Sequence, residues 1–367
     1  MVKLSPSDPL SIAFRVEVGA ELSAYLDGRA AALAEVGPET ANLVELARAF
    51  TTGGKRVRPA FCCWGYLAAT GETEVPDQVL RAAASLDLLH VAALVHDDVM
   101  DGSDTRRGLP AAHVQFERWH AANRRRGSAT AFGRAAAILL GDLLLLWSAE
   151  MFASCGAPAQ RLAAAAPLAA LVREEVNAGQ ALDVTAQTRP PLEARTDPAS
   201  VTDQIRRVVE YKTARYTVIR PLQIGAALGG ASPELLDALA RIGSPLGRGF
   251  QFRDDVLGVF GDEVVTGKPT GDDLREGKLT VLIAKAMAGA SEAEATELDA
   301  LLGRPLSPAE VARAQQIITT SGALAATEAE IETSATQALA ALAAAGLPPV
   351  ATAGLTELVH LATQRDA

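Results

Sequence analysis

The chain has 367 residues, of which 49% are hydrophobic and only 4% aromatic, and this Ala- and Leu-rich composition favours closely packed helices over a β-rich fold. A net charge of −10 argues against a general nucleic-acid surface, because binding to phosphate backbones relies on excess Lys and Arg. The three cysteines, Cys62, Cys63 and Cys155, are odd in number and lack metal-ligand spacing, which excludes a disulfide scaffold or zinc site and fits a reducing cytosol.

Neither the N-terminal segment nor the most apolar run indicates export or a membrane span. No long apolar stretch follows Lys3, so we expect no signal peptide and a cytoplasmic protein. The most apolar run, residues 135–147, is interrupted by Gly141 and Asp142 and is shorter than the roughly 20 residues of a spanning helix. We therefore predict a buried core helix there.

Helical periodicity and the positions of Gly and Pro predict an all-α protein from end to end. We find no fixed-period repeat and no interdomain linker, so residues 1–367 are predicted to form a single domain, with its motifs in 53–280 and C-terminal helices in 281–367. A basic connector at 121–133 and a Gly-rich loop at 261–277 interrupt the helices. The predicted helices cover residues 10–36, 40–51, 59–70, 76–97, 134–154, 159–187, 201–229, 233–260 and 279–288, with two or three more in the tail.

Two acidic clusters lie far apart in the chain, each at the end of an apolar helical stretch. The first is Asp97-Asp98-Val-Met-Asp101 and the second is Asp254-Asp255-Val-Leu-Gly258. Asp97 and Asp101 are four residues apart, so on a helix they project from one face. Mg²⁺ prefers oxygen ligands and shares them with substrate phosphates, so the clusters predict one shared metal site that anchors a diphosphate.

Three basic groups accompany the acids. Gly53-Gly54-Lys55-Arg56-Val-Arg58 stands at a helix entrance, where positive charge and free N–H groups favour anions. Arg106-Arg107 follows the first cluster closely enough to reach a phosphate there. Lys212-Thr213, joined by Lys268 and Lys278, makes a third group. Taken alone, each group is equally consistent with a solvated surface, and His90 and His96 with helix packing.

In combination, these segments closely resemble the trans-polyprenyl diphosphate synthase family, of the geranylgeranyl type. The matching motifs run in order from Gly53 to Thr280. They are Gly-Gly-Lys-Arg-Val-Arg-Pro at 53–59, His-Asp-Asp-Val-Met-Asp at 96–101, Arg-Arg-Gly-Leu-Pro at 106–110, Gly-Gln-Ala-Leu-Asp at 179–183, Lys-Thr at 212–213, Phe-Gln-Phe-Arg-Asp-Asp at 250–255 and Thr-Gly-Lys-Pro-Thr-Gly-Asp-Asp at 266–273.

The resemblance implies the isoprenoid synthase fold, a bundle of antiparallel helices around a deep central cavity, usually in a homodimer. It implies that Asp97, Asp101 and Asp254 ligate about three Mg²⁺ ions per active site, with support from Asp98 and Asp255. The implied roles of the other residues fall into three groups. The allylic diphosphate is gripped by Arg106, Lys212 and Lys268; isopentenyl diphosphate lies on Lys55, Arg58, His90 and Arg107 beside Phe250; Gln180, Thr213 and Gln251 steady a carbocation while Asp183 orients Lys212.

The implied reaction condenses isopentenyl diphosphate with dimethylallyl, geranyl or farnesyl diphosphate. The allylic carbon–oxygen bond ionises, isopentenyl diphosphate attacks the cation, and loss of a proton gives a linear product one isoprene unit longer. Closure of the 261–277 loop is a candidate lid that excludes water. One departure matters: many relatives have a third Asp where this chain has Gly258, and Asp262, Asp272 or Asp273 are candidate substitutes.

Product length is argued from the helix that leads to Asp97. Ala93 and Ala92 lie about one turn before Asp97 and Leu89 about two. Aromatic residues at the first-turn positions stop chain growth at farnesyl in the family, so the alanines favour geranylgeranyl diphosphate, and longer products stay open. A terpene cyclase, whose usual Asn/Ser/Glu metal motif we do not find, and a non-catalytic partner subunit are the alternatives.

Overall fold

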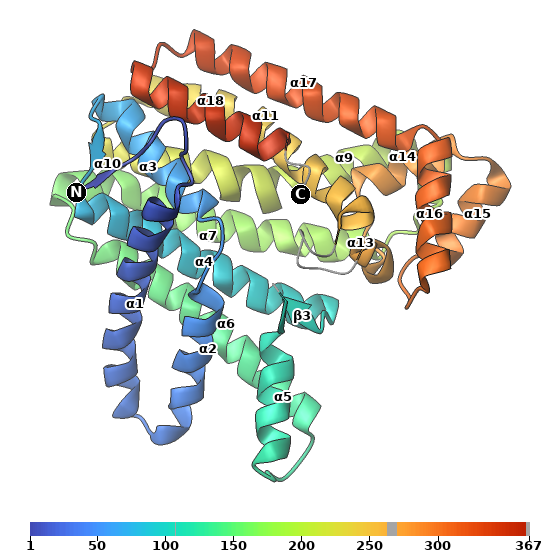
Figure 1. The fold of residues 1–367 in the computed structure, drawn as a ribbon, viewed down its shortest axis with the longest axis horizontal. Coiled ribbons are helices and arrows are strands. Elements are labelled where there is room, and N and C mark those ends of the chain that lie inside the picture. The colour runs from blue at the N-terminus through green and yellow to red at the C-terminus, as the bar shows by residue number, and fades with distance from the viewer. Residues whose placement is uncertain (107, 263–269, 365–367) are drawn as a thin grey trace. The chain divides into compact units, whose positions relative to one another are not determined.

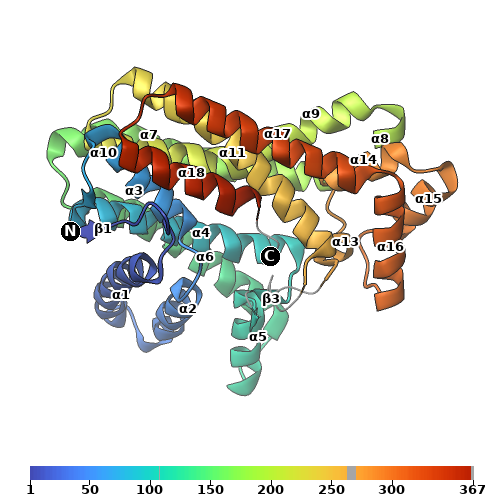
Figure 2. The same ribbon diagram turned by 45° about the horizontal axis from the view of Figure 1, so that its top comes forward.

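Helices make up nearly all the regular structure of the residues that the computed structural model describes, which are 1–106, 108–262 and 270–364 (Figures 1 and 2). Within these residues the strands form two antiparallel pairs of two residues each, β1 with β2 and β3 with β4. The prediction of an all-α protein is therefore confirmed.

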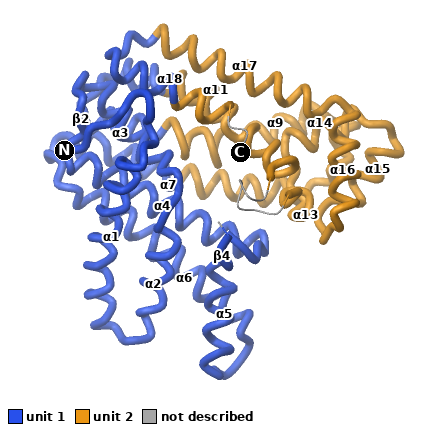
Figure 3. Tube along the Cα trace, in the orientation of Figure 1, with its two compact units in different colours: residues 1–173, 220–239, 345–357 blue, residues 174–219, 240–344, 358–367 orange. Residues whose placement is uncertain are grey.

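The chain divides into two compact units, each built from three separate segments (Figure 3). Unit 1 comprises residues 1–173, 220–239 and 345–357, and unit 2 comprises residues 174–219, 240–344 and 358–367. Three helices contribute residues to both units, namely α7 (Ala159–Gln187), α11 (Pro233–Phe260) and α18 (Pro349–Thr363). The single-domain organisation stays a prediction.

Unit 1 depends on helices that touch backbone to backbone at glycines. Gly65 on α3 (Val57–Thr70) lies against α10 (Arg220–Gly229), and Gly225 on α10 lies against α3. A Cβ at Gly225 would be only 1.7 Å from the carbonyl oxygen of Cys62. In both ribbon views α1 and α2 lie side by side as a hairpin. The elements of unit 1 are β1 (Val2–Lys3), α1 (Ile12–Ala34), η1 (Pro38–Thr40), α2 (Ala41–Thr51), α3 (Val57–Thr70), β2 (Glu74–Val75), α4 (Asp77–Asp101), β3 (Thr105–Arg106), β4 (Leu109–Pro110), α5 (Ala112–Ala122), α6 (Ala129–Ala153) and α10 (Arg220–Gly229).

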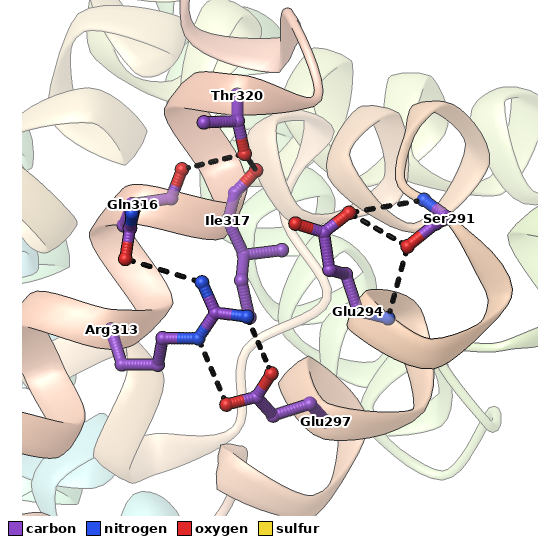
Figure 4. A network of polar contacts seen from close by, with 7 residues as sticks. All are labelled: Ser291, Glu294, Glu297, Arg313, Gln316, Ile317 and Thr320. Atoms are coloured by element: carbon purple, nitrogen blue, oxygen red, sulfur yellow. Dashed lines mark hydrogen bonds and ion pairs between the residues drawn. The ribbon is translucent and has the colours of Figure 1, made fainter.

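Unit 2 has an apolar core. Side chains are contributed to it by α9 (Pro198–Val208), α11, α14 (Val281–Gly289), α15 (Glu292–Leu301), α16 (Pro308–Thr320) and α17 (Ala323–Ala344). Ser291 caps α15 through a reciprocal pair of hydrogen bonds with Glu294, and Arg313 on α16 forms an ion pair with Glu297 on α15 at 2.7 Å (Figure 4). The elements of unit 2 are α8 (Glu193–Thr196), α9 (Pro198–Val208), η2 (Val209–Ile219), α13 (Asp272–Glu276), α14 (Val281–Gly289), α15 (Glu292–Leu301), α16 (Pro308–Thr320) and α17 (Ala323–Ala344).

Helix α6 differs from the predicted buried core helix. Ile138, Leu139 and Leu146 are 45%, 58% and 64% exposed, so one apolar face of α6 is uncovered in the single chain. By length and composition alone α4 and α6 could each cross a membrane, a test that core helices of soluble proteins also pass. The most apolar 18-residue window is 72% buried in α4 but 44% buried in α6.

Candidate active site

The first acidic cluster occupies the last turn of α4. The helix ends at Asp101, and Gly102 follows in the left-handed conformation (φ 68°), which favours glycine. Asp98 is 1% exposed and accepts a hydrogen bond from Nε of Arg106 at 2.8 Å. The short β3–β4 hairpin carries Arg106, whose Nη2 lies 4.0 Å from Oδ2 of Asp97. Asp98 thus holds a guanidinium group beside the more exposed Asp97.

His96 fastens the same turn of α4 to α6. Its Nε2 lies 3.1 Å from the carbonyl oxygen of Ile138 and 3.5 Å from Oδ1 of Asp142. A Cβ at Gly141 would lie 2.2 Å from His96 Nε2, so only glycine leaves room for the ring. His96 therefore packs between α4 and α6, and it holds the turn of α4 that carries Asp97 against α6.

The segment 53–58 leads into α3. Lys55 is exposed and Arg58 partly buried at the start of the helix, where free N–H groups favour an anion. Arg56 has a left-handed backbone (φ 54°) and a buried side chain that forms an ion pair with the buried Asp87. Its Nη2 also donates to the carbonyl oxygen of Thr51 at 2.5 Å. The sequence motif at 53–59 gives no indication of this structural role of Arg56.

The residues predicted to set product length lie on α4 before the cluster. Leu89 and Ala92 are 1% and 2% exposed, while Ala93 and His90 are partly exposed. The predicted positions one and two turns before Asp97 therefore lie on one continuous helix with the cluster.

In unit 2 a chain of hydrogen bonds joins η2 to the second acidic cluster on α11. The hydroxyl of Thr213 donates to Oε1 of Gln251, and Nε2 of Gln251 donates to Oδ1 of Asp255 at 2.8 Å. Burial, together with the neighbouring charges of Asp273 and Asp254, raises the pKa of Asp255 to about 8, and the Gln251 hydrogen bond opposes this rise. Burial within the second cluster thus disfavours the charged form of Asp255.

Asp273 on α13 lies where the side chain of residue 258 would begin. A Cβ at Gly258 would lie 2.1 Å from Oδ2 and 2.4 Å from Cγ of Asp273. The position that carries an acid in many relatives is therefore filled here by a carboxylate from a later segment.

Lys212 lies in the π-helical stretch η2, between α9 and α10. Its Nζ forms an ion pair with Oδ2 of Asp183 on α7 at 2.5 Å, and a Cβ at Gly179 would lie 2.5 Å from the backbone nitrogen of Lys212.

The other predicted residues of unit 2 lie elsewhere along the chain. Lys278 forms an ion pair with Glu276 at 2.5 Å. Gln180 and Phe250 lie on α7 and α11.

A family model described as "Polyprenyl synthetase" matches residues 40–319, which is most of the chain and includes both acidic clusters. The chain belongs to the polyprenyl synthetase family. The prediction of an enzyme that transfers prenyl groups is thereby confirmed. Arg107 and Lys268, two of the predicted residues, lie outside the described residues of this polyprenyl synthetase.

Known relatives agree with this assignment. A crystal structure of geranylgeranyl pyrophosphate synthase from Corynebacterium glutamicum, complexed with isoprenyl diphosphate and magnesium, has a TM-score of 0.89 and 39% identity, covering 96% of this chain and 98% of that chain. The predicted isoprenoid synthase fold is therefore confirmed. A geranylgeranyl diphosphate synthase from Saccharolobus solfataricus is 33% identical over 276 residues, which are 73% of this chain and 74% of that protein. A (2E,6E)-farnesyl diphosphate synthase from Mycobacterium tuberculosis is 30% identical over 318 residues, which are 86% of this chain and 80% of that protein.

The donor set of this polyprenyl synthetase fits Mg²⁺. Both clusters offer carboxylate oxygens, the hard ligands that Mg²⁺ prefers. Within the described residues no three His, Cys, Asp or Glu side chains gather closely enough to enclose a metal. Mg²⁺ is usually held by one or two carboxylates together with substrate phosphates, so an open arrangement suits it. The predicted sharing of one site by both clusters stays a prediction, because the clusters belong to different units.

Proposed function

We propose that this chain condenses isopentenyl diphosphate with an allylic diphosphate and releases geranylgeranyl diphosphate. The observation that carries the proposal is the acid–guanidinium arrangement at the end of α4, where buried Asp98 holds Arg106 next to Asp97. A binding site for a metal diphosphate needs carboxylates for the metal and a cation for the phosphate oxygens within reach of each other. Both are present on one turn of helix and the hairpin that follows it.

The side chains of this polyprenyl synthetase do their work by binding and orienting charge. Arg106 and Lys212, each fixed by an acid, supply donors to the departing diphosphate, which takes the electron pair of the allylic carbon–oxygen bond. Asp97, Asp101 and Asp254 would hold the Mg²⁺ ions, about three by the family resemblance, which would neutralise the remaining charge of that diphosphate. Gln251, oriented by Thr213 and Asp255, presents its amide dipole to the carbocation. Lys55 and Arg58 hold isopentenyl diphosphate, whose condensed cation loses its proton to the released diphosphate.

The remaining predicted residues are proposed to assist these steps. Their roles follow the family resemblance. Isopentenyl diphosphate is bound with the help of His90, Arg107 and Phe250; the allylic diphosphate with the help of Lys268 and Lys278; Asp98, Asp255 and Gln180 support the metals and the cation.

We also propose that Asp273 supplies the carboxylate that Gly258 lacks. The support is its position, since the Asp273 carboxylate occupies the first atoms of any side chain at 258 and contributes to the raised pKa of Asp255. The second cluster would then have three acids, Asp254, Asp255 and Asp273, although only two are adjacent in sequence.

The assay of turnover separates the candidate functions. Purified chain is incubated with Mg²⁺, isopentenyl diphosphate and either geranyl or farnesyl diphosphate, and the dephosphorylated products are identified by chromatography. Linear C20 alcohol supports the proposal, longer linear alcohols indicate a longer-chain synthase, and cyclic hydrocarbons indicate a terpene cyclase. A chain that turns over neither primer is a non-catalytic subunit, and the proposal fails.

Ala93→Phe tests the product-length part of the proposal. Ala93 is small and partly exposed one turn before Asp97, so a phenyl ring there should block chain growth and shorten the main product from C20 to C15. Product distribution by chromatography is the measurement. Leu94→Phe is the matched control, because Leu94 is the next residue on α4, is also partly exposed and points about 100° away around the helix. Leu94→Phe should leave the product distribution as in the wild type. An unchanged product from Ala93→Phe would show that residue 93 does not limit product length.

The proposed setting is a cytoplasmic homodimer. The buried, unpaired thiols of Cys62, Cys63 and Cys155 suit a reducing compartment, and the exposed apolar face of α6 suits a second copy of the chain.

A further inference from the structure

Helices α4 and α6 pack antiparallel within unit 1, and two contacts fix their register. Nη1 of Arg81, near the start of α4, donates to the carbonyl oxygen of Cys155, just beyond the end of α6, at 3.1 Å. Near the end of α4, His96 lies against Gly141, at the middle of α6. Each step towards the end of α6 is therefore a step towards the start of α4.

This register places Ser148 of α6 at the depth where the product-length helix reaches Leu89. Ser148 comes seven residues after Gly141 on α6. Leu89 comes seven residues before His96 on α4. Seven residues are close to two helical turns, so Ser148 faces α4 as Gly141 does, at the level of Leu89. That level is about two turns before Asp97 on α4.

Arg173 on α7 brings a guanidinium group to the same level. Its Nη2 donates to Oγ of Ser148 at 3.2 Å, and its Nη1 donates to the carbonyl oxygen of Ala169. Ser148 is 0% exposed, so the tip of the arginine reaches the interior of unit 1. Burial lowers the pKa of Arg173 to about 10, which still leaves the side chain charged at neutral pH.

The surroundings of this charged group are apolar. Among the buried residues of α6, all of which lie in the described part of the chain, Ser148 is the only one that carries a hydroxyl. Four neighbours along α6 and α7 are at most 2% exposed, namely Leu144, Met151, Ala169 and Val172. A hydrocarbon chain can lie against such side chains, but it cannot cover a guanidinium group without a large desolvation cost.

Arg173 also shares a face of α7 with Gln180. Gln180, which is proposed to steady the carbocation, comes seven residues later on the same continuous helix. The two side chains therefore project from one side of α7, about two turns apart. Arg173 is thus about as far along α7 from Gln180 as Leu89 is along α4 from Asp97.

We propose that Arg173, held by Ser148, ends the hydrocarbon pocket and limits the product to four isoprene units. The inference deepens the proposed function and rests on it, because it requires the product to grow along α4 from Asp97. By the family resemblance, an aromatic ring about one turn before the first Asp stops growth at farnesyl, which has three units. A barrier one turn deeper fits a product one unit longer. The barrier in this chain is a charge.

The test is product analysis of the full-length chain with Mg²⁺, isopentenyl diphosphate and farnesyl diphosphate. Arg173→Met replaces the cation by an unbranched apolar side chain, so the product should lengthen from C20 to C25 or beyond. We expect the ratio of C25 to C20 product to rise at least about tenfold. Arg173→Lys keeps a cation and should stay near the wild type. Arg161→Met is the matched control, since Arg161 is exposed on the same helix, more than three turns earlier.

Product length and turnover separate the possible outcomes. A longer product from Arg173→Met alone supports the inference, because a purely structural role would lower turnover or stability and leave the product length unchanged. An active Arg173→Met with the product distribution of the wild type overturns the inference and leaves the proposed function standing. A wild type that elongates no primer refutes the proposed function and the inference with it. If circular dichroism shows Arg173→Met to be misfolded, Arg173→Gln replaces it and must lengthen the product as well.

Discussion

Asp97 and Asp98 are neighbours on α4, yet their surroundings assign them different tasks. The Asp98 side chain is 1% exposed and bonds Arg106, whereas the Asp97 side chain is 15% exposed and 4.0 Å from that arginine. Asp98 therefore positions a cation beside Asp97, which is the residue proposed to ligate the metal. The consequence is that substitutions at these two positions should fail in different ways.

Asp97→Ala should lower kcat at least about a hundredfold, because the transition state loses a ligand of the ion that neutralises the leaving diphosphate. Far-ultraviolet circular dichroism should stay near that of the wild type, since Asp97 is partly exposed at the end of its helix. The exposed Asp104 in the next loop provides the control substitution, Asp104→Ala, which should retain activity. Retained turnover in Asp97→Ala would refute its role as a metal ligand.

Gly258→Asp should damage this protein although it restores the acid that many relatives have. The new Cβ would meet Oδ2 of Asp273 at 2.1 Å, and its charge would join the carboxylates that already raise the pKa of Asp255. We expect a loss of about 1–3 kcal/mol of unfolding free energy, measured by urea denaturation. Asp273→Gly in the same chain should recover the stability and the affinity for Mn²⁺ measured by electron spin resonance. If the double variant recovers neither, Asp273 does not stand in for residue 258.

The residues predicted from motifs were those whose chemistry and spacing are visible in sequence. Asp97, Asp101 and Arg106 are close along the chain, so their proximity on α4 and β3 follows from helix geometry. The approach of Asp273 on α13 to Gly258 on α11 is a tertiary contact, which spacing along the sequence does not reveal. The burial of Arg56 against Asp87 likewise depends on tertiary packing.

Long helices were predicted closely, and local irregularities were not. The predicted ranges 159–187 and 233–260 coincide with α7 and α11 because Pro, Gly and polar residues delimit them. The predicted helix 201–229 is interrupted by the π-helical η2, where Lys212 and Thr213 lie. In a π-helix each backbone N–H bonds the carbonyl five residues earlier instead of four, a change that the apolar pattern of the sequence does not reveal. Such segments often mark functional sites. The helix α5 was missed, since it is short and adjoins the polar connector.

Gly225→Ala tests the close packing of α3 against α10. A methyl group there would lie 1.7 Å from the carbonyl oxygen of Cys62, so the helices must separate, and we expect a loss of about 1–3 kcal/mol of unfolding free energy, or more. Gly28→Ala is the matched control on α1, where a Cβ meets nothing within 4 Å, and it should stabilise the protein by about 0.5–1 kcal/mol. Urea denaturation measures both. Equal effects of the two substitutions would contradict backbone contact as the reason for Gly225.

At the scale of the whole molecule, the sequence predicted one domain because no linker separates its parts. The structure contains two compact units, and α7, α11 and α18 each supply residues to both. These helices continue from one unit into the other without a Pro-, Gly- or charge-rich linker, so the single-domain organisation stays a prediction. Hydrophobic periodicity alone could not predict which face of α6 would stay uncovered, because it does not indicate which elements pack against a helix.

The uncovered face of α6 is where we expect a second copy of the chain. Ile138, Leu139 and Leu146 are about half exposed or more on one helix, and contiguous apolar exposure of this kind marks interaction surfaces. Leu139→Glu places a charge at the centre of this face, and burying an unpaired charge in an interface costs several kcal/mol. Light scattering after gel filtration should therefore show twice the chain mass for the wild type and the single-chain mass for Leu139→Glu. Val36→Glu is the control, since Val36 is 74% exposed and isolated after α1, and it should leave the dimer intact. A wild type that is monomeric, or a Leu139→Glu variant that stays dimeric, would exclude this face as the interface.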